Sequence, residues 1–504
     1  MMQWRFRIVF IILGLSLVIV FGRLIVLQLF EKDYYKTLAN ENRIKVIPLR
    51  AERGIIYDEH HEPMVDNGVE GREYVLGKAG SQVLGYVGEI SEEELKRCRE
   101  EAEEKREECR FKIKDMVGKM GVEKQYDQVL RGIDGGILME VDADGRIKRE
   151  IGRSEPIAGQ SIELNLNLGL QRMAYEALNQ KRGAVVVSRP EGQILALVSS
   201  PGFDPLNLIN YINDFDLPMF NRSLGGEYPP GSVFKIITAA AALEEGKVNR
   251  ETLIEDTGEI SIGDQWQYGN WYYYQHGKKE GELNLVKAIA RSNDIFFYKL
   301  GEWLGIQKLS DWARYFGVGN LTEIDLDGEA YGLMPDADWK KEFKRESWFL
   351  GDTYISAIGQ GDILMTPLQV NLMTQVIADN GRLCRPQIKK QEIVCQDLKI
   401  KPSTIELIKE GMRQVNETGG TAYPFFDLQV NGQKLETAGK TGTAEFGDSD
   451  KTHAWYTVMA PADKPEIVVT VLVEEGGEGS AVAAPIAKEI IDYWATTPGC
   501  SGQK

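Results

Sequence analysis

A serine and a lysine stand one helical turn apart in the segment YPPGSVFKIITAAAALEEG, Tyr228 to Gly246. A Pro-Pro-Gly turn followed by an apolar run that stops at glycine predicts a helix opening at Ser232, with Ser232 and Lys235 on one face. An apolar site lowers the pKa of a lysine, which can then remove the proton of a serine hydroxyl. The pair also arises by chance, usually as a helix-capping serine and a solvated lysine. By itself it does not define an enzyme.

Two further segments carry residues that could complete such a site. In AIARSNDIFFYKLG, Ser292 and Asp294 stand at the start of a predicted aromatic-rich helix, and GKTGTAEF, Gly439 to Phe446, lies on a predicted strand. The order Ser-x-x-Lys, Ser-x-Asp/Asn, Lys-Thr-Gly is known from serine β-lactamases and penicillin-binding proteins. One such motif can occur by chance. Three motifs in the expected order, each on the expected type of helix or strand, are much less easily explained by chance. The candidate site residues are therefore Ser232, Lys235, Ser292, Asp294, Lys440, Thr441, Gly442 and Thr443.

The elements that must position these residues alternate between strands and helices. The stretch from Gly159 to Leu178 predicts a strand before a helix, and Gly183 to Ser199 predicts a hairpin around Arg-Pro-Glu-Gly. Three β-rich runs follow near the other end, at 434–446, 454–460 and 466–474. Strands at both ends of a region whose middle is helical predict an α+β fold with an antiparallel sheet built from sequence-distant segments.

The N-terminal segment predicts one membrane span. Ile8 to Gly22 contains no charge, and apolar residues resume after Arg23 as far as Phe30. At about 1.5 Å per residue this stretch reaches roughly 34 Å, enough for a bilayer core. No small-residue cleavage site follows, which favours an uncleaved anchor over a signal peptide. Basic residues flank both ends, so charge alone leaves the orientation open: Arg5 and Arg7 before the span, Lys32, Lys36 and Arg43 after it.

The region after the span contains a second predicted helix, from Ser91 to Met120. Ser91 with Glu94 forms a capping box, apolar residues repeat at helical spacing, and Gly118 and Gly121 end the pattern. The five cysteines are too few for a disulfide scaffold and lack zinc-site spacing. Cys384 and Cys395 could close one small loop, but buried free thiols are expected for most of the five, Cys98, Cys109, Cys384, Cys395 and Cys500.

Composition and the remaining polar residues narrow the classes of function. Asp and Glu outnumber Lys and Arg by 76 to 59, and a net charge of −17 disfavours a nucleic-acid partner. The four histidines show no metal-ligand spacing, so neither a metal nor a cofactor is expected. His453 could belong to a Ser-His-Asp triad, but its strand context favours a structural or rim histidine. The aromatic residues Trp266, Trp271 and Tyr272 to Tyr274 could line a substrate groove or pack a surface loop.

With these motifs the chain resembles a class B penicillin-binding protein, most closely the penicillin-binding protein 2 type that acts in cell elongation. The resemblance covers nearly everything from Arg53 to the last predicted strand. It includes RGIIYD, VLGYVGEIS, MGVEKQYDQVLRGIDG, NRSLGGEYPPGSVFK, IGQGDILMTPLQ and HAWYTVMAP. It implies a cytoplasmic stub and anchor (1–30), a short pedestal of the dimerisation type (31–160), an extracytoplasmic transpeptidase domain (161–497) and a tail (498–504).

The resemblance also implies the chemistry. Ser232 would attack the penultimate D-Ala carbonyl of a peptidoglycan stem peptide, with Lys235 as base, and a second stem peptide's amine would take the acyl group. Ser292 would relay a proton to the leaving amine and Asp294 would orient Ser292 and Lys235. Lys440, Thr441 and Thr443 would bind the substrate carboxylate, and the backbone N–H groups of Ser232 and Thr443 would form the oxyanion hole. β-Lactam antibiotics would acylate the same serine.

Two departures from the family pattern bear on these expectations. The usual second motif is Ser-x-Asn, whereas here Asn293 stands in the middle and Asp294 in the third place. Only about 30 residues separate RGIIYD from VLGYVGEIS, so the pedestal is expected to lack a head subdomain. A polytopic glycosyltransferase of the cell-wall machinery is the partner that the family suggests. The competing functions are a β-lactam sensor, an inactive assembly scaffold and a serine β-lactamase; the anchor and the complete motif set argue against them.

Overall fold

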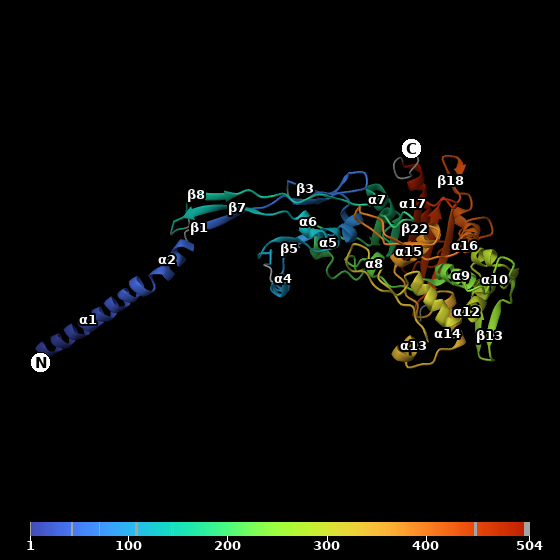
Figure 1. The fold of residues 1–504 in the computed structure, drawn as a ribbon, viewed down its shortest axis with the longest axis horizontal. Coiled ribbons are helices and arrows are strands. Elements are labelled where there is room, and N and C mark those ends of the chain that lie inside the picture. The colour runs from blue at the N-terminus through green and yellow to red at the C-terminus, as the bar shows by residue number, and fades with distance from the viewer. Residues whose placement is uncertain are drawn as a thin grey trace. The chain divides into compact units, whose positions relative to one another are not determined.

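A computed structural model describes residues 2–41, 44–69, 71–105, 109–142, 144, 146–447 and 451–497. The backbone divides into two compact units, each made of two stretches of chain. One unit comprises Met1–Gly54 and Gln128–Gln160, and the other comprises Ile55–Asp127 and Ser161–Lys504. Figure 1 colours the chain from blue to red, so that the segments of each unit can be followed.

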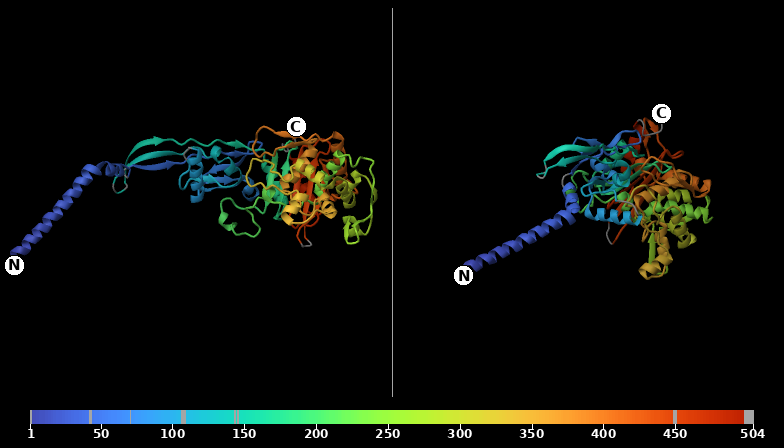
Figure 2. Two further views of the ribbon diagram at one scale, coloured as in Figure 1. Left: turned by 60° about the horizontal axis from the view of Figure 1, so that its bottom comes forward. Right: turned by 60° about the vertical axis from the view of Figure 1, so that its left-hand side comes forward.

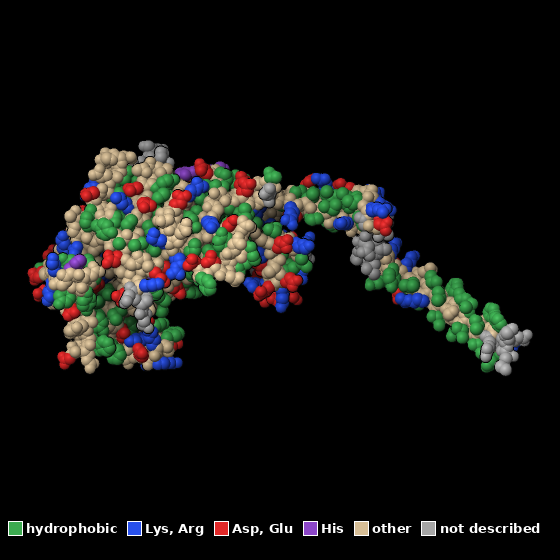
Figure 3. Space-filling model, turned by 180° about the vertical axis from the view of Figure 1, so that it is seen from behind, with side chains coloured by type: hydrophobic (Ala, Val, Ile, Leu, Met, Phe, Trp, Pro, Cys, Tyr) green, Lys and Arg blue, Asp and Glu red, His purple; other side chains and the backbone are tan. Residues whose placement is uncertain are grey.

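The first unit combines the N-terminal helices with a small sheet. Helix α1 (Met2–Ile25) continues through a π-helical turn (Val26–Phe30) and is followed by α2 (Lys32–Glu41). The segment Phe6–Phe30 is long and apolar enough to cross a membrane, close to the predicted span, and Figure 3 shows apolar side chains along it. Strands β1 (Ile44–Leu49), β7 (Gly135–Val141) and β8 (Ile147–Ser154) form an antiparallel sheet in the order β1-β7-β8.

The N-terminal part of the second unit is built from short strands and short helices. A four-stranded sheet has the order β4-β3-β2-β9, in which β2 pairs in parallel with β9. The elements are β2 (Ile56–Tyr57), β3 (Pro63–Gly68), β4 (Gly71–Tyr74), α3 (Ser81–Leu84), β5 (Val87–Glu89), α4 (Glu92–Lys105), β6 (Met116–Gly118), α5 (Gly121–Gln125) and β9 (Ile162–Glu163). Helix α6 (Asp127–Leu130) begins on the last residue of the first stretch of this unit, and its other residues belong to the first unit.

The predicted helix from Ser91 to Met120 is wrong in its second half. Ser91 and Glu94 do form the capping box, since each backbone N–H bonds the other's side chain. The helix α4 ends at Lys105, however, and residues 116–118 pair with β5 as strand β6. Eleven residues of helix would separate Cys98 from Cys109 by about 16 Å, whereas their Cα atoms are 5.6 Å apart. The helical spacing of Cys109 and Met116 was therefore coincidental.

The expectation that most cysteines are free thiols is also wrong. Cys98 bonds Cys109, and Cys384 bonds Cys395 across the paired strands β16 (Arg382–Cys384) and β17 (Cys395–Asp397). Each disulfide closes a short segment of chain that turns back on itself, which the sequence pattern did not reveal for the first pair. Cys500 lies outside the described residues.

The core of the second unit is a five-stranded antiparallel sheet, as the sequence predicted. Its order is β11-β10-β22-β21-β20, so the two earlier strands join the three later ones through the pairing of β10 with β22. Every residue of the three strands β10, β11 and β22 is buried, as in a sheet covered on both faces. The strands are β10 (Gly183–Ser188), β11 (Ile194–Ser200), β20 (Ala438–Glu445), β21 (Thr452–Ala460) and β22 (Ile467–Val473).

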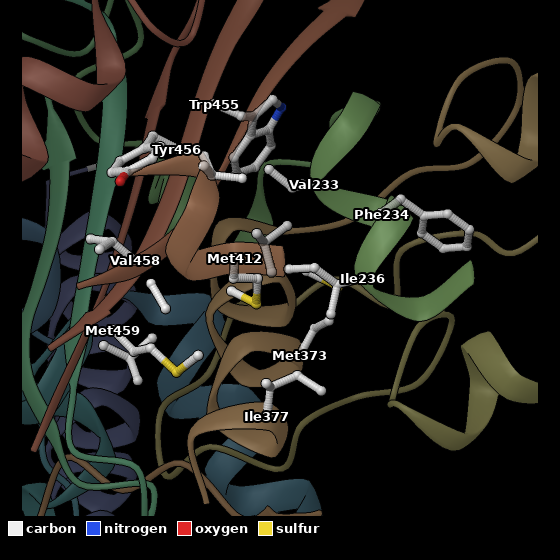
Figure 4. Close-up of a cluster of buried hydrophobic side chains, with 14 of the residues drawn as sticks. Val233, Phe234, Ile236, Met373, Ile377, Met412, Trp455, Tyr456, Val458 and Met459 are labelled. Atoms are coloured by element: carbon white, nitrogen blue, oxygen red, sulfur yellow. The ribbon is translucent and has the colours of Figure 1, made fainter. Parts of the chain in front are cut away.

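Helices cover this sheet, as Figures 1 and 2 show. Helices α7 (Leu168–Ala177) and α17 (Ala483–Thr496) pack on each other and on the sheet, and α15 (Pro367–Ala378) packs on β10, β21 and β22. Next to them lie α9 (Lys235–Glu244) and α16 (Pro402–Val415). Figure 4 shows side chains from these segments meeting in one buried cluster, including Val233, Ile236, Met373, Met412 and Trp455.

The remaining elements surround the helical layer. Helices α11 (Leu285–Arg291), α12 (Asp294–Tyr315) and α14 (Leu350–Ala357) pack near α9 and α16. The others are α8 (Arg222–Gly225), β12 (Ile254–Asp256), β13 (Glu259–Ile262), β14 (Trp266–Gly269), α10 (Trp271–His276), β15 (Gly281–Leu283), α13 (Ala337–Trp339), β18 (Gln429–Val430) and β19 (Gln433–Lys434).

Candidate active site

The predicted nucleophile segment lies directly against the edge strand of the sheet. A 3₁₀ turn, Gly231–Phe234, leads into α9, so the helix begins slightly later than Ser232. Gly231 has a φ of 55°, and a Cβ there would lie 2.7 Å from Thr443 O. Only glycine fits such a position without strain. This close approach places Ser232 beside β20, where it lines a cleft.

Lys235 is fully buried at the start of α9, one turn after Ser232. Its Nζ donates to Asp294 Oδ1 at 2.6 Å and to the Ser292 carbonyl oxygen at 2.8 Å, and it lies 3.3 Å from Ser292 Oγ. Burial lowers the pKa of Lys235, while the charge of Asp294 opposes that shift. The lysine is thus held by groups from the second motif and is not solvated.

The second motif occupies the junction between α11 and α12. Ser292 adopts a left-handed conformation with φ of 54° after the last residue of α11. Asn293 caps α12 by accepting from Phe296 N at 2.9 Å, and Asp294 is the first residue of that helix. This turn directs Ser292 and Asp294 toward Lys235, whereas the amide of Asn293 donates to Glu280 Oε2 at 3.1 Å.

The third motif runs along β20, at the edge of the five-stranded sheet. Lys440 is fully buried, and its Nζ donates to Ser292 Oγ at 2.8 Å and to Thr441 O at 2.9 Å. Burial and the charge of Lys235 hold the pKa of Lys440 well below its usual range. Thr441, Gly442 and Thr443 line the same cleft as Ser232, and Thr441 Oγ1 shares a 2.7 Å hydrogen bond with Thr421 Oγ1. Six of the eight predicted residues therefore line one cleft, and the two buried lysines, Lys235 and Lys440, contact Ser292 of that lining.

A buried chain of hydrogen bonds that the motifs did not indicate supports Asp294. Asn270, which is fully buried, accepts from Asp294 N at 3.2 Å and donates to Asp256 Oδ2 at 3.0 Å. Trp271 N donates to Asp294 Oδ2 at 2.9 Å. Asn270 stands between strand β14 and helix α10, and nothing in the local sequence indicates such a role, because its partners lie 14 and 24 residues away.

The cleft has a volume of about 1280 Å³ and an aromatic wall. Trp271 and Tyr274 line it, whereas Tyr272 and Tyr273 are not among its lining residues and Trp266 is 63% exposed. Of the five aromatic residues for which the sequence suggested a place in a substrate groove, two therefore line the cleft. Further rings along this wall are Tyr268, Tyr298, Tyr423 and Phe446.

His453 is a buried structural residue of β21. Its ring stacks on Phe446 at 4.1 Å and meets the Tyr228 ring edge at 5.3 Å, and its Nδ1 accepts from Glu475 N at 3.3 Å. No hydrogen bond joins His453 to Ser232 among the described residues. Burial lowers the pKa of His453 and favours the neutral ring.

The antiparallel sheet, the serine beside its edge strand and the buried lysines define a class of protein: serine acyl-transferases of the kind that penicillin acylates. Family models agree. Residues 182–492 match the penicillin-binding protein transpeptidase domain, and residues 68–164 match the penicillin-binding protein dimerisation domain.

Curated relatives and solved structures are similar over most of the chain. Peptidoglycan D,D-transpeptidase MrdA of Acinetobacter baumannii is 34% identical over 84% of this chain and 66% of its own length, and that of Haemophilus influenzae is 28% identical over 94% and 89%. The crystal structure of Pseudomonas aeruginosa PBP2 in complex with WCK 5153 has a TM-score of 0.76 at 32% identity, covering 91% of this chain and all of that one. Helicobacter pylori PBP2 in complex with MreC has a TM-score of 0.76 at 28% identity over 90% and 98%.

The chain belongs to the penicillin-binding protein transpeptidase family, as a class B protein of the penicillin-binding protein 2 type. It is a serine-type D,D-transpeptidase of peptidoglycan synthesis, with an N-terminal apolar helix that fits a single-pass membrane anchor.

Proposed function

We propose that Ser232 is the nucleophile of peptidoglycan cross-linking and that Lys235 is its base. The observation that carries this proposal is the burial of Lys235 one turn after Ser232, with its Nζ bonded to both Asp294 and Ser292. A buried amine has the lowered pKa that a base at neutral pH requires. Ser292 then passes a proton to the leaving amine, and Asp294 orients the lysine.

Lys440, Thr441 and Thr443 bind the carboxylate of the terminal D-Ala. They lie along one edge strand, beside Ser232, where an extended peptide can align with β20. The N–H groups of Ser232 and Thr443 stabilise the oxyanion that forms at the penultimate D-Ala carbonyl. The terminal D-Ala leaves, and the amine of a second stem peptide resolves the acyl-enzyme.

Acylation of the full chain in detergent by a labelled penicillin tests this proposal. The expected result is a stable adduct that Ser232→Ala abolishes and that Ser403→Ala, which replaces an exposed serine of α16, retains. Rapid release of the label would indicate a β-lactamase. A folded protein that forms no adduct would overturn the catalytic assignment and favour an assembly scaffold.

The domain division also belongs to the proposal: an anchor at 1–30, a pedestal at 31–160, a transpeptidase domain at 161–497 and a tail at 498–504. The disulfides Cys98–Cys109 and Cys384–Cys395 support an extracytoplasmic location for everything after the anchor. Structural disulfides persist in oxidising compartments and are rare in the cytosol.

The protein works with partners of the cell-wall machinery, and the finer proposal is that these include a polytopic glycosyltransferase and an MreC-type protein. The support is similarity: the Helicobacter structure is a complex of PBP2 with MreC, and another similar chain comes from a peptidoglycan synthase complex. Co-purification from detergent extracts, with and without residues 1–30, tests the association through the anchor. Unchanged association after removal of the anchor would place the contact elsewhere.

A further inference from the structure

Two buried amines share one carboxylate in this site. Lys235 and Lys440 are both fully buried. Lys235 is paired with Asp294, whereas within the part of the chain that the structure describes Lys440 bonds only Ser292 Oγ and Thr441 O. An unpaired buried charge is costly, and a buried group without a counter-ion loses its charge instead. The resting site therefore holds one ammonium, at Lys235, and one neutral amine, at Lys440.

This arrangement conflicts with the role proposed for Lys235. A protonated Lys235 cannot accept the hydroxyl proton of Ser232. The neutral amine, Lys440, belongs to the group of residues that meets the substrate carboxylate. The proton is thus on the lysine that must lose it before acylation begins.

Ser292 offers a route between the two lysines. Its Oγ lies 3.3 Å from Lys235 Nζ and 2.8 Å from Lys440 Nζ. A hydroxyl can accept a hydrogen bond from an ammonium while donating its own hydrogen to a neutral amine. The three groups therefore form a continuous path from one nitrogen to the other.

We propose that the substrate carboxylate, on reaching Lys440, draws a proton from Lys235 to Lys440 through the Ser292 hydroxyl, and so generates the base only when substrate is bound. An N–H bond of Lys235 breaks as an O–H bond forms on Ser292, and the original O–H bond of Ser292 breaks as an N–H bond forms on Lys440. No net charge is gained by the three groups. The inference rests on the proposed function, and it adds how substrate binding converts Lys235 into a base.

The surrounding charges agree with this direction of transfer. Asp294 and, more distantly, the carboxylate of Glu280 favour the charged form of Lys235, and the Phe297 ring lies 5.4 Å from its Nζ. For Lys440 the neighbouring charge is Lys235 itself, which disfavours a second ammonium, with Asp294 as the smaller opposing influence. A substrate carboxylate at Lys440 would supply the counter-ion that the described residues around its Nζ do not provide.

Two donors that differ in one group test the proposal on the full chain in detergent. One is a benzoyl-D-alanyl thioester of thioglycolate, and the other carries a carboxamide in place of its carboxylate. Single-turnover acylation at saturating donor is measured from pH 6 to 9.5, with Ser232→Ala as the background. We expect a nearly flat profile from pH 7 upward for the carboxylate donor, and for the carboxamide a slow rate that rises about tenfold per pH unit as the base titrates.

Parallel profiles, with the carboxylate changing only the concentration for half-saturation, would overturn the proposal and leave the proposed function intact. Failure of both donors to acylate the wild-type protein would overturn the proposed function itself. Ser292→Ala provides the second arm: the carboxylate donor should acquire the steep pH dependence. Ser403→Ala, which removes an exposed hydroxyl of α16 away from the cleft lining, should keep the flat profile. A flat profile for Ser292→Ala would exclude the serine as the route.

Discussion

At the scale of single residues, the site depends on which side chain of the second motif faces the lysines. Asp294 bonds Lys235, whereas Asn293 caps α12 and bonds Glu280. The one-residue departure from Ser-x-Asn is thus accommodated without a slip, because the left-handed turn at Ser292 directs the third residue inward.

Substitution at these two neighbouring positions should therefore separate catalysis from stability. Asp294→Ala removes the side chain that holds Lys235 in position, and we expect penicillin acylation to fall by about 10²-fold or more. Asn293→Ala loses a helix cap, and we expect a loss of about 1 kcal/mol in unfolding free energy with a smaller effect on acylation. Acylation rates and thermal unfolding of both variants provide the comparison. If Asn293→Ala lowered acylation more than Asp294→Ala does, Asn293 would be the functional third residue of the second motif.

The acid limb of the pH profile gives a second prediction at Asp294. The carboxylate raises the pKa of Lys235 against the lowering caused by burial. Asp294→Asn removes that charge, so Lys235 should lose its proton at lower pH, and the acid limb of carboxamide-donor acylation should move to lower pH. A limb that stays in place or moves upward would show that Asp294 does not set the charge of Lys235.

His453 should make the fold sensitive to mild acid. Because burial lowers its pKa in the folded state, the unfolded chain binds the proton more readily. Stability should therefore be lost as pH falls below about 6.5, the ordinary histidine pKa, by at most about 1.4 kcal/mol per pH unit for one proton. Thermal unfolding between pH 7 and 5 measures this, and His453→Gln should show a smaller loss. An equal loss in the variant would assign the acid sensitivity to other groups.

At the scale of elements, the sequence predicted the helices and strands that follow from a local residue pattern. It missed the interactions that depend on contact between distant segments. The strands of the central sheet followed from β-rich runs, and the nucleophile helix followed from its Pro-Pro-Gly start and glycine stop. The motifs brought together the six residues that line the cleft and the two buried lysines that contact Ser292, but only because a family pattern relates segments far apart in the sequence. Asn270 and Asp256 were missed because hydrogen bonds between distant segments leave no periodic signal.

Asn270 connects the aromatic wall of the cleft with the first turn of α12. Its amide has an N–H donor on one side and a carboxylate on the other, so no smaller side chain satisfies both. We expect Asn270→Ala to lower the acylation rate about tenfold, because Asp294 is then held less firmly in position. In a chain that already carries Asp294→Ala, the same substitution should lower the rate little further. Asn284→Ala, which removes the cap of the neighbouring helix α11, is the matched control. Fully additive effects in the double variant would mean that Asn270 does not act through Asp294.

The strands β16 and β17 pair over three residues, so their disulfide should contribute much of their stability. A cross-link that closes a loop of this length stabilises a fold by about 2–4 kcal/mol, mainly by restricting the unfolded chain. Cys384→Ser with Cys395→Ser should accordingly lower the melting temperature, and a reducing agent should lower that of the wild type by a similar amount. Reduction that affects wild type and variant equally would point to Cys98–Cys109 as the important bond.

At the scale of the whole molecule, the anchor and the disulfides make one joint prediction about orientation. A span at Phe6–Phe30 with the rest outside would place Cys98, Cys109, Cys384 and Cys395 in an oxidising compartment. In intact spheroplasts, an added protease should therefore digest the chain beyond the anchor while a cytoplasmic marker survives. The charges flanking the span do not decide this, since basic residues stand on both sides.

Thiol labelling provides an independent measure of the same orientation. If residues 31–504 face outward, both cysteine pairs in the full chain should resist alkylation after the protein is isolated from cells and unfolded, unless a reductant is added first. A chain retained in the cytosol by deletion of residues 1–30 should instead have free thiols that are alkylated without a reductant. Penicillin acylation of the truncated chain, measured before and after oxidation, would separate loss of folding from loss of location. Protection from external protease together with free thiols would place the domain inside and overturn the extracytoplasmic assignment.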